Sequence, residues 1–242
     1  MTQIAGKALP DDVIVQIVER TDGVPLFVEE LTKTVLESGV TPHGIPATLH
    51  DSLMARLDRL GSFRQLAQIG AAIGREFSYP LLRTVSGLPE EELQTALARL
   101  VASELVFQRG IPPDAIYSFK HALVQDAAHG SLLRSARQQL HAQIAEALGA
   151  NFPEMMETQP ELFAQHYAEA GLIEKSVAHW GKAGQRSAAR SAMAEAAAQF
   201  QRGLDELALL PDDLQRKRLE QLQALSLELT GLSVEGVTTL ER

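Results

Sequence analysis

The sequence predicts a mainly helical protein that contains one small β-hairpin. Ala, Leu, Glu, Gln and Arg dominate the 242 residues, and these are strong helix formers, whereas aromatic residues make up only 5%. Apolar residues recur at helical spacing in successive segments, and Gly or Pro separates one segment from the next. Only one stretch, between residues 105 and 120, has the composition that strands prefer.

Residues 1–61 predict three helices. The first covers residues 10–20 and ends before Gly23, and the second begins at Pro25 and ends at Gly39. The third begins at Pro46 and ends at Gly61. Proline in the first turn of a helix and glycine just after the last turn are typical of helix boundaries.

Residues 62–150 predict further helices around the hairpin. Ser62 and Gln65 are three residues apart and form a capping box that would begin one helix, and Ser135 and Gln138 repeat the pattern. The other helices are predicted at residues 79–85, 89–103, 121–133 and 136–148.

The hairpin is predicted from two β-prone runs, residues 105–109 and 115–120, which flank a Gly-Ile-Pro-Pro-Asp turn. Phe107 and Tyr117 are expected on paired strands. Helices followed by a two-stranded wing are the order of a winged-helix domain, so this fold is predicted for residues 62–150.

Residues 151–242 predict a run of helices joined by short connections. Residues 151–159 contain Pro153 and precede Pro160, so they form the predicted domain boundary. Helices are then expected at residues 161–170, 173–190, 192–210 and 213–230. This pattern favours a tetratricopeptide-like α-solenoid. At most two such repeats fit, whereas about three are needed for stability, so we expect the natural protein to continue beyond Arg242.

The composition excludes several classes of function. The formal net charge of −9 is atypical of a nucleic-acid-binding protein, and the absence of cysteine excludes disulfides, thiolate catalysis and cysteine zinc sites. No apolar run approaches the length of about 18–20 residues that a membrane span needs, and the N-terminus lacks the apolar core of a signal peptide. A cytoplasmic protein without a membrane partner is predicted.

The sequence also lacks recognisable catalytic machinery. Gly181-Lys182 is not part of a phosphate-binding loop, because Ser176 and Ala183 replace the required Gly and Ser or Thr. The histidines show no metal-ligand spacing, and acid pairs such as Glu29-Glu30 are interpreted as solvated charges near helix N-termini. We therefore predict no catalytic residue, no metal site and no enzymatic activity for the isolated chain.

Three segments together resemble the C-terminal part of STAND-class signal-transduction ATPases. They are residues 21–31 (TDGVPLFVEEL), 45–60 (IPATLHDSLMARLDRL) and 119–128 (FKHALVQDAA). In their order they are similar to the lid with its Gly-x-Pro motif, the linker helix and the wing end of the MalT-like predicted ATPases that accompany bacterial adenylate cyclases and LuxR-type regulators. With the tetratricopeptide-like tail, the resemblance covers nearly the whole chain.

The resemblance implies that residues 1–61 form a helical lid and that the lid and the winged helix close over ATP or ADP. The nucleotide would be held by an N-terminal P-loop domain that is missing here, and Gly23, Pro25 and His121 would contact it. Ala122 replaces the Asp that follows the corresponding histidine in some relatives. The parent would be an ATPase, linked to an adenylate cyclase domain or to transcriptional regulation. The isolated chain would need no cofactor and would offer its repeats to a protein partner.

Two other functions are compatible with the pattern. A stand-alone helical-repeat scaffold would use only the concave surface that such arrays present. A DNA-binding winged helix would read bases with residues 89–103, but this segment opens with three glutamates, Glu90, Glu91 and Glu92, and offers only Arg99 as a cation. These acids would repel phosphates, so DNA is an unlikely partner.

Overall fold

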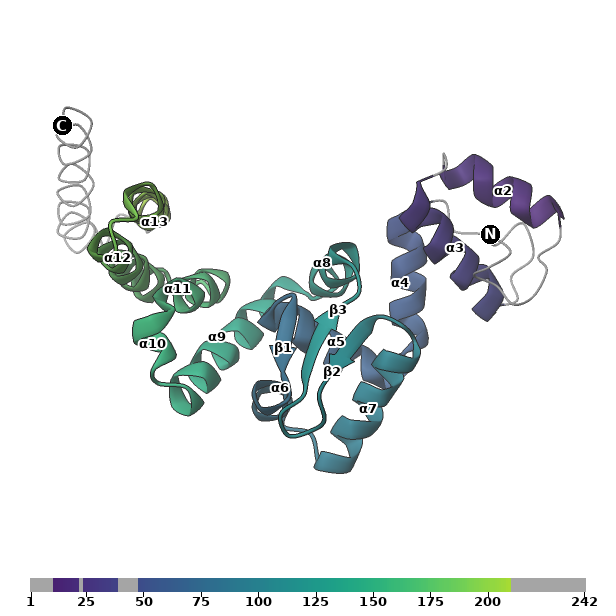
Figure 1. Ribbon diagram of the computed structural model, residues 1–242, viewed down its shortest axis with the longest axis horizontal. Coiled ribbons are helices and arrows are strands. Elements are labelled where there is room, and N and C mark those ends of the chain that lie inside the picture. The colour runs from purple at the N-terminus through teal and green to yellow at the C-terminus, as the bar shows by residue number, and fades with distance from the viewer. Residues whose placement is uncertain (1–10, 22–23, 39–47, 210–242) are drawn as a thin grey trace. The chain divides into compact units, whose positions relative to one another are not determined.

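A computed structural model describes residues 11–21, 24–38 and 48–209 (Figure 1). The chain divides into two compact units, Met1–Leu132 and Leu133–Arg242. The described residues are mainly helical, and the first unit also contains a small antiparallel sheet. No helix in the described ranges is both long and apolar enough to cross a membrane.

The described part of the first unit contains, in order, the helices α2 (Asp11–Thr21), α3 (Pro25–Ser38) and α4 (Leu49–Arg59), which confirms the three predicted helices. Buried residues join α2 to α3: Val13, Ile17, Leu31 and Val35. The Thr48 hydroxyl accepts a hydrogen bond from the Asp51 amide and thereby caps α4. Pro46 lies outside the described residues.

The predicted hairpin is confirmed. Strands β2 (Val106–Arg109) and β3 (Ile116–Phe119) pair antiparallel, with Phe107 opposite Ser118 and Gln108 opposite Tyr117. A third strand, β1 (Glu76–Ser78), pairs with the other edge of β3, so the order is β1-β3-β2.

The prediction that the chain forms strands only in the hairpin is therefore wrong, because β1 is a third strand. Strand β1 is only three residues long, which is too short for alternation to reveal it. Its central Phe77 is buried and stacks on Tyr117 with ring centroids 5.8 Å apart. Tertiary stacking rather than local sequence pattern holds this strand in place.

The remaining helices of the first unit's described part pack against the strands or against one another (Figure 1). They are the 3₁₀ helix η2 (Gly61–Phe63), α5 (Arg64–Ile73), α6 (Tyr79–Ser86), α7 (Glu90–Ala102) and α8 (Ala122–Gly130). Gly87 ends α6 in the left-handed conformation with φ of 61°, as the sequence predicts. The prediction of a capping box formed by Ser62 and Gln65 is wrong, because Ser62 lies within η2 and no side chain caps α5.

The second unit consists of helices in the described residues: α9 (Arg134–Asn151), α10 (Met155–Thr158), α11 (Pro160–Glu169), α12 (Ile173–Ala189) and α13 (Met193–Leu207). The predicted capping box of Ser135 and Gln138 is also wrong, because Ser135 lies inside α9 and the N-cap residue of this helix is Leu133. The predicted helix at residues 213–230 lies outside the described residues.

Helix α9 belongs to the second unit because it packs against α11. The sequence grouped it with residues 62–150 and placed the boundary at residues 151–159, whereas the compact units divide at Leu132. Helix α10 occupies the supposed linker. Further along, α12 and α13 share a buried core of Val177, Ala196, Phe200 and Leu207.

Candidate functional site

The candidate site is a group of charged residues in the first unit that are distant in sequence. They lie on α3, α4, the end of β3, the start of α8 and the turn after α7. We call this group the polar cluster; it consists of Glu29, Glu30, Lys33, Arg56, Glu104, Lys120 and His121.

Glu29 and Glu104 share two lysines. The Lys120 ammonium donates to Glu29 Oε1 over 2.6 Å, and Lys33, one turn further along α3, donates to the same oxygen over 2.8 Å. Lys33 also contacts Glu104, and Lys120 lies 3.4 Å from the Glu104 carboxylate. Hydrogen bonds from Lys120 and Lys33 lower the pKa of Glu29 to about 2, so Glu29 is ionised at neutral pH.

Glu104 reaches this arrangement through an uncommon backbone conformation. Its φ is 53°, in the left-handed region that side-chain-bearing residues rarely occupy. The hydrogen bond from Lys33 lowers the pKa of its carboxyl group. Such a backbone conformation has a cost, which the surrounding contacts must offset.

The most buried part of the polar cluster is an ion pair between α3 and α4. The side chains of Glu30 and Arg56 are only 1% and 2% exposed and form a salt bridge, and Arg56 also donates to the Ser103 carbonyl oxygen. Burial lowers the pKa of Arg56. The sequence interpretation of Glu30 as a solvated acid is therefore wrong, because its carboxylate is paired inside the fold.

His121 completes the polar cluster at the start of α8. Its imidazole Nε2 is buried and has no hydrogen-bond partner among the described residues, and the same is true of Glu30 Oε1. One ligand-type atom from each of Glu29, Glu30 and His121 lies within 4.8 Å of the other two. Burial lowers the pKa of His121, which favours the neutral imidazole at pH 7.

The residues predicted from the sequence have different outcomes. His121 lies in the polar cluster, Pro25 begins α3 and is exposed, and Gly23 lies outside the described residues. The fold thus places His121 beside the helix that Pro25 begins. The sequence predicted no metal site, yet the fold brings three residues with ligand atoms together.

Sequence reasoning missed the partners of His121. The spacing of Glu29 and Lys33, four apart on one helix, is the single signal that the sequence offered for this group. Lys120 is 91 residues from Glu29, and Arg56 is 26 from Glu30. Only the packing of α3 on α4 and on the end of β3 creates these pairs.

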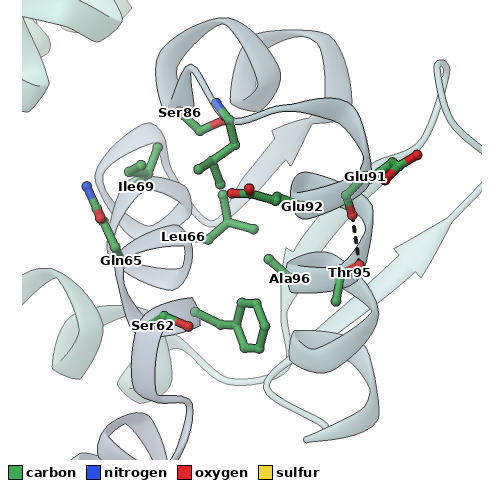
Figure 2. Close-up of a pocket in the computed structure, with 11 residues that line it drawn as sticks. Ser62, Gln65, Leu66, Ile69, Ser86, Glu91, Glu92, Thr95 and Ala96 are labelled. Atoms are coloured by element: carbon green, nitrogen blue, oxygen red, sulfur yellow. Dashed lines mark hydrogen bonds between the residues drawn. The ribbon is translucent and has the colours of Figure 1, made fainter.

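A groove of about 580 Å³ lies elsewhere on the first unit, between α5 and the N-terminal half of α7 (Figure 2). Its apolar surface comes from residues such as Leu66 and Ile69, and Glu91 and Glu92 line its α7 side. Among the described residues no Lys or Arg lines it. The start of α7 is therefore acidic in the fold as well as in the sequence.

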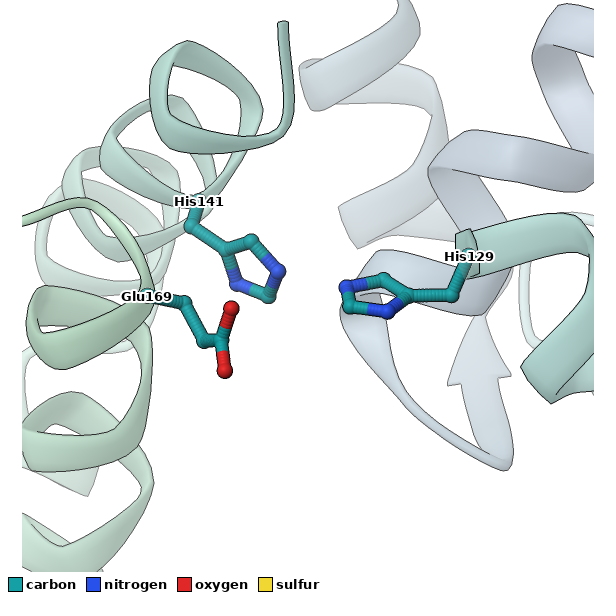
Figure 3. Close-up of side chains that lie close together, drawn as sticks. All are labelled: His129, His141 and Glu169. Carbon is teal, nitrogen blue, oxygen red and sulfur yellow. The ribbon is translucent and has the colours of Figure 1, made fainter. Parts of the chain in front are cut away.

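A buried histidine pair occupies the second unit. His141 of α9 and His166 of α11 place their Nδ1 atoms 2.9 Å apart, and both side chains are buried. In Figure 3 the carboxylate of Glu169, a residue of α11, lies beside the His141 ring. The third residue drawn, His129, belongs to the first unit. Burial, together with the nearby His141, lowers the pKa of His166 to about 3.

We expect the second unit to lose stability as the pH falls from about 6.5, the ordinary pKa of histidine, toward the folded-state value of about 3. The unfolded chain binds a proton on His166 that the folded chain excludes, so this stability is fully present above about pH 6.5. The decline is about 1.4 kcal/mol per pH unit. Urea unfolding followed by the fluorescence of Trp180, the chain's one tryptophan, measures this at pH 7, 6 and 5.

The variant His166→Phe should flatten this pH dependence, although His179, whose pKa is also lowered by burial, continues to contribute. His50→Gln, on the exposed surface of α4 in the first unit, serves as the control and should keep the full slope. If the free energy of unfolding depended on pH in His166→Phe as it does in the unchanged chain, His166 would not be the source of the pH dependence.

Comparison with known proteins finds a similar sequence in a bacterial protein. No protein-family model matches the chain. The chain is similar to "Uncharacterized protein R02095" of Rhizobium meliloti (strain 1021), with 31% identity over 196 residues. The match covers 76% of this chain but 19% of that protein. The chain thus spans about a fifth of the length of this curated relative.

Proposed function

We propose that this chain is a non-catalytic regulatory and interaction part of a multidomain signal-transduction ATPase of the STAND class. In this proposal α2, α3 and α4 form the helical lid segment, and α5 to α8 with the β2–β3 wing form a winged-helix module. Helices α9 to α13 begin a tetratricopeptide-like array. The parent ATPase would be linked to an adenylate cyclase domain or to transcriptional regulation.

The observation that carries the proposal is the meeting of two distant segments. The resemblance assigned nucleotide contacts to the start of α3 and to His121, and these segments join through the polar cluster. The bond from Lys120 to Glu29 spans 91 residues of sequence. A lid and a wing end that act on one nucleotide would need this proximity.

The chain's own part in the mechanism is to stabilise a closed state. A P-loop domain elsewhere would supply the phosphate-binding loop and the metal-assisted chemistry of ATP hydrolysis. The ion pairs of Glu29 and Glu30 hold α3 against α4 and the end of β3. A ligand that binds the closed arrangement better than the open one would shift the population toward it.

The second unit supports the interaction role. Helices α11, α12 and α13 pack one on the next in sequence order, as in arrays of helical repeats. The length of the relative, of which this chain matches 19%, supports a multidomain parent. In the scaffold alternative the repeats would still bind a protein partner, but no nucleotide would bind near the polar cluster.

The proposal predicts that ADP affinity depends on His121 when the chain is present together with its P-loop domain. A hydrogen bond to a charged group contributes about 1.5–3 kcal/mol, so His121→Ala should weaken ADP binding by about tenfold or more. Calorimetric titration of the full-length protein with ADP measures this, with the exposed His50→Ala as a matched control.

The result that would overturn the proposal is equal ADP affinity in the full-length protein and in His121→Ala. Failure of the full-length protein to bind any adenine nucleotide would instead favour the scaffold. Salt-dependent retardation of duplex DNA would favour the winged-helix DNA-binding alternative, against which the acidic start of α7 argues.

A further inference from the structure

The geometry points to a divalent-metal site in the polar cluster: we propose that Glu29, Glu30 and His121 bind one Zn²⁺ or Mn²⁺ ion. This goes beyond the regulatory function proposed above and does not depend on it. Each of the three residues contributes one atom, and these atoms already lie within 4.8 Å of one another.

Two of the three residues have buried atoms that lack a partner. Glu30 Oε1 and His121 Nε2 form no hydrogen bond with the described residues, and the Glu30 side chain is 1% exposed. A buried polar atom without a partner has lost its hydration with nothing to replace it, which native folds rarely tolerate. Two such atoms on residues of one cluster call for an explanation, and a bound ion or water is the usual one.

The chemistry of the donors favours a transition-metal ion. Imidazole nitrogen suits Zn²⁺ and related ions, and carboxylate oxygens suit Mn²⁺ and Zn²⁺. A metal ion binds the neutral imidazole through a ring nitrogen, and His121 Nε2 is buried without a hydrogen-bond partner among the described residues. Three protein ligands leave a coordination position open, as in zinc sites that also hold water or a substrate.

The neighbouring cations leave Glu30 Oε1 and His121 Nε2 without a hydrogen bond. Arg56 contacts Glu30 through Oε2, which leaves Oε1 available, and Lys33 and Lys120 both direct their bonds at Glu29 Oε1. An ionised carboxylate offers about four lone-pair positions, so Glu29 can be shared. Both lysines also keep Glu104 as a second partner.

Binding can be measured on the chain alone, without nucleotide. Calorimetric titration of chelator-stripped protein with Zn²⁺, and separately with Mn²⁺, should give one ion per chain at the polar cluster, and Mg²⁺ should bind more weakly. His121→Ala and Glu30→Gln should each weaken binding by at least about 100-fold, because even outer-shell partners of a metal site contribute about 10–100-fold.

Matched controls separate ligation from charge. Glu104→Gln removes a negative charge from the polar cluster without removing a ligand atom, and His50→Ala removes an exposed histidine, so both should bind within about threefold of the parent chain. Because Glu30→Gln can weaken folding, His121→Ala and the shift of the His121 imidazole NMR signals on Zn²⁺ addition provide independent readouts. No bound ion, or an affinity unchanged in His121→Ala, would overturn the proposal.

Discussion

Arg56→Met is expected to destabilise the first unit by about 3–5 kcal/mol. The Arg56 side chain is 2% exposed, and its guanidinium contacts the Glu30 carboxylate and the Ser103 carbonyl oxygen. Removing it leaves an ionised group buried without its counter-charge, which is far more costly than the loss of an exposed pair. Amide exchange of β3 in metal-free buffer gives the free energy of opening for this unit.

The double variant Glu30→Met/Arg56→Met tests the physical reason for this loss. Replacing both charges by apolar side chains of similar volume removes the desolvation penalty, so the double variant should regain most of the stability lost in Arg56→Met. Arg83→Met is the control, because Arg83 and Glu90 form an exposed pair 3.5 Å apart and should contribute less than about 1 kcal/mol. If the single and double variants were equally unstable, lost packing rather than an unpaired charge would be the cause.

Phe200→Ala is expected to destabilise the second unit by about 3–5 kcal/mol. Phe200 is fully buried between α12 and α13 and packs with Val177, Ala196 and Leu207. The ring also fills the space above Gly184, where a Cβ atom would lie only 2.5 Å from it. Truncation therefore leaves a cavity in a close-packed core, and urea unfolding followed by Trp180 fluorescence measures the loss.

Leu133→Ala provides the comparison for Phe200→Ala. Leu133 is 78% exposed, so this change should alter the free energy of unfolding by less than about 0.5 kcal/mol. Phe200→Leu, which retains most of the volume, should cost less than about 2 kcal/mol. A loss below about 1 kcal/mol in Phe200→Ala would mean that the helices repack around the missing ring.

Helix existence was predictable from the sequence, whereas helix starts and the third strand were not. Apolar periodicity with Gly and Pro punctuation located α2, α3 and α7, because these signals act within one helix. The capping-box pattern failed at Ser62 and Ser135, since a Ser–Gln spacing also arises inside helices. Strand β1 depends on the stacking of Phe77 on Tyr117, which no local pattern encodes.

The candidate site was predictable only in part. His121 was selected through a resemblance, but its carboxylate neighbours Glu29 and Glu30 were interpreted as surface charges. Adjacent acids in the first half of a helix are usually solvated. Whether such an acid is buried depends on the helix packed against it, and here α4 covers Glu30 and supplies Arg56.

The central position of β3 decides which side of the polar cluster can move. The amide of Phe119 donates to the carbonyl oxygen of Arg75, and that of Lys120 donates to the carbonyl oxygen of Leu105, so the backbone leading to His121 is anchored from both flanks. Helix α3 has no such sheet anchorage; side-chain ion pairs and a small apolar core hold it. If the polar cluster opens, α3 should therefore detach first. Lys120 and His121 should stay in place, because the backbone before them is bonded on both sides.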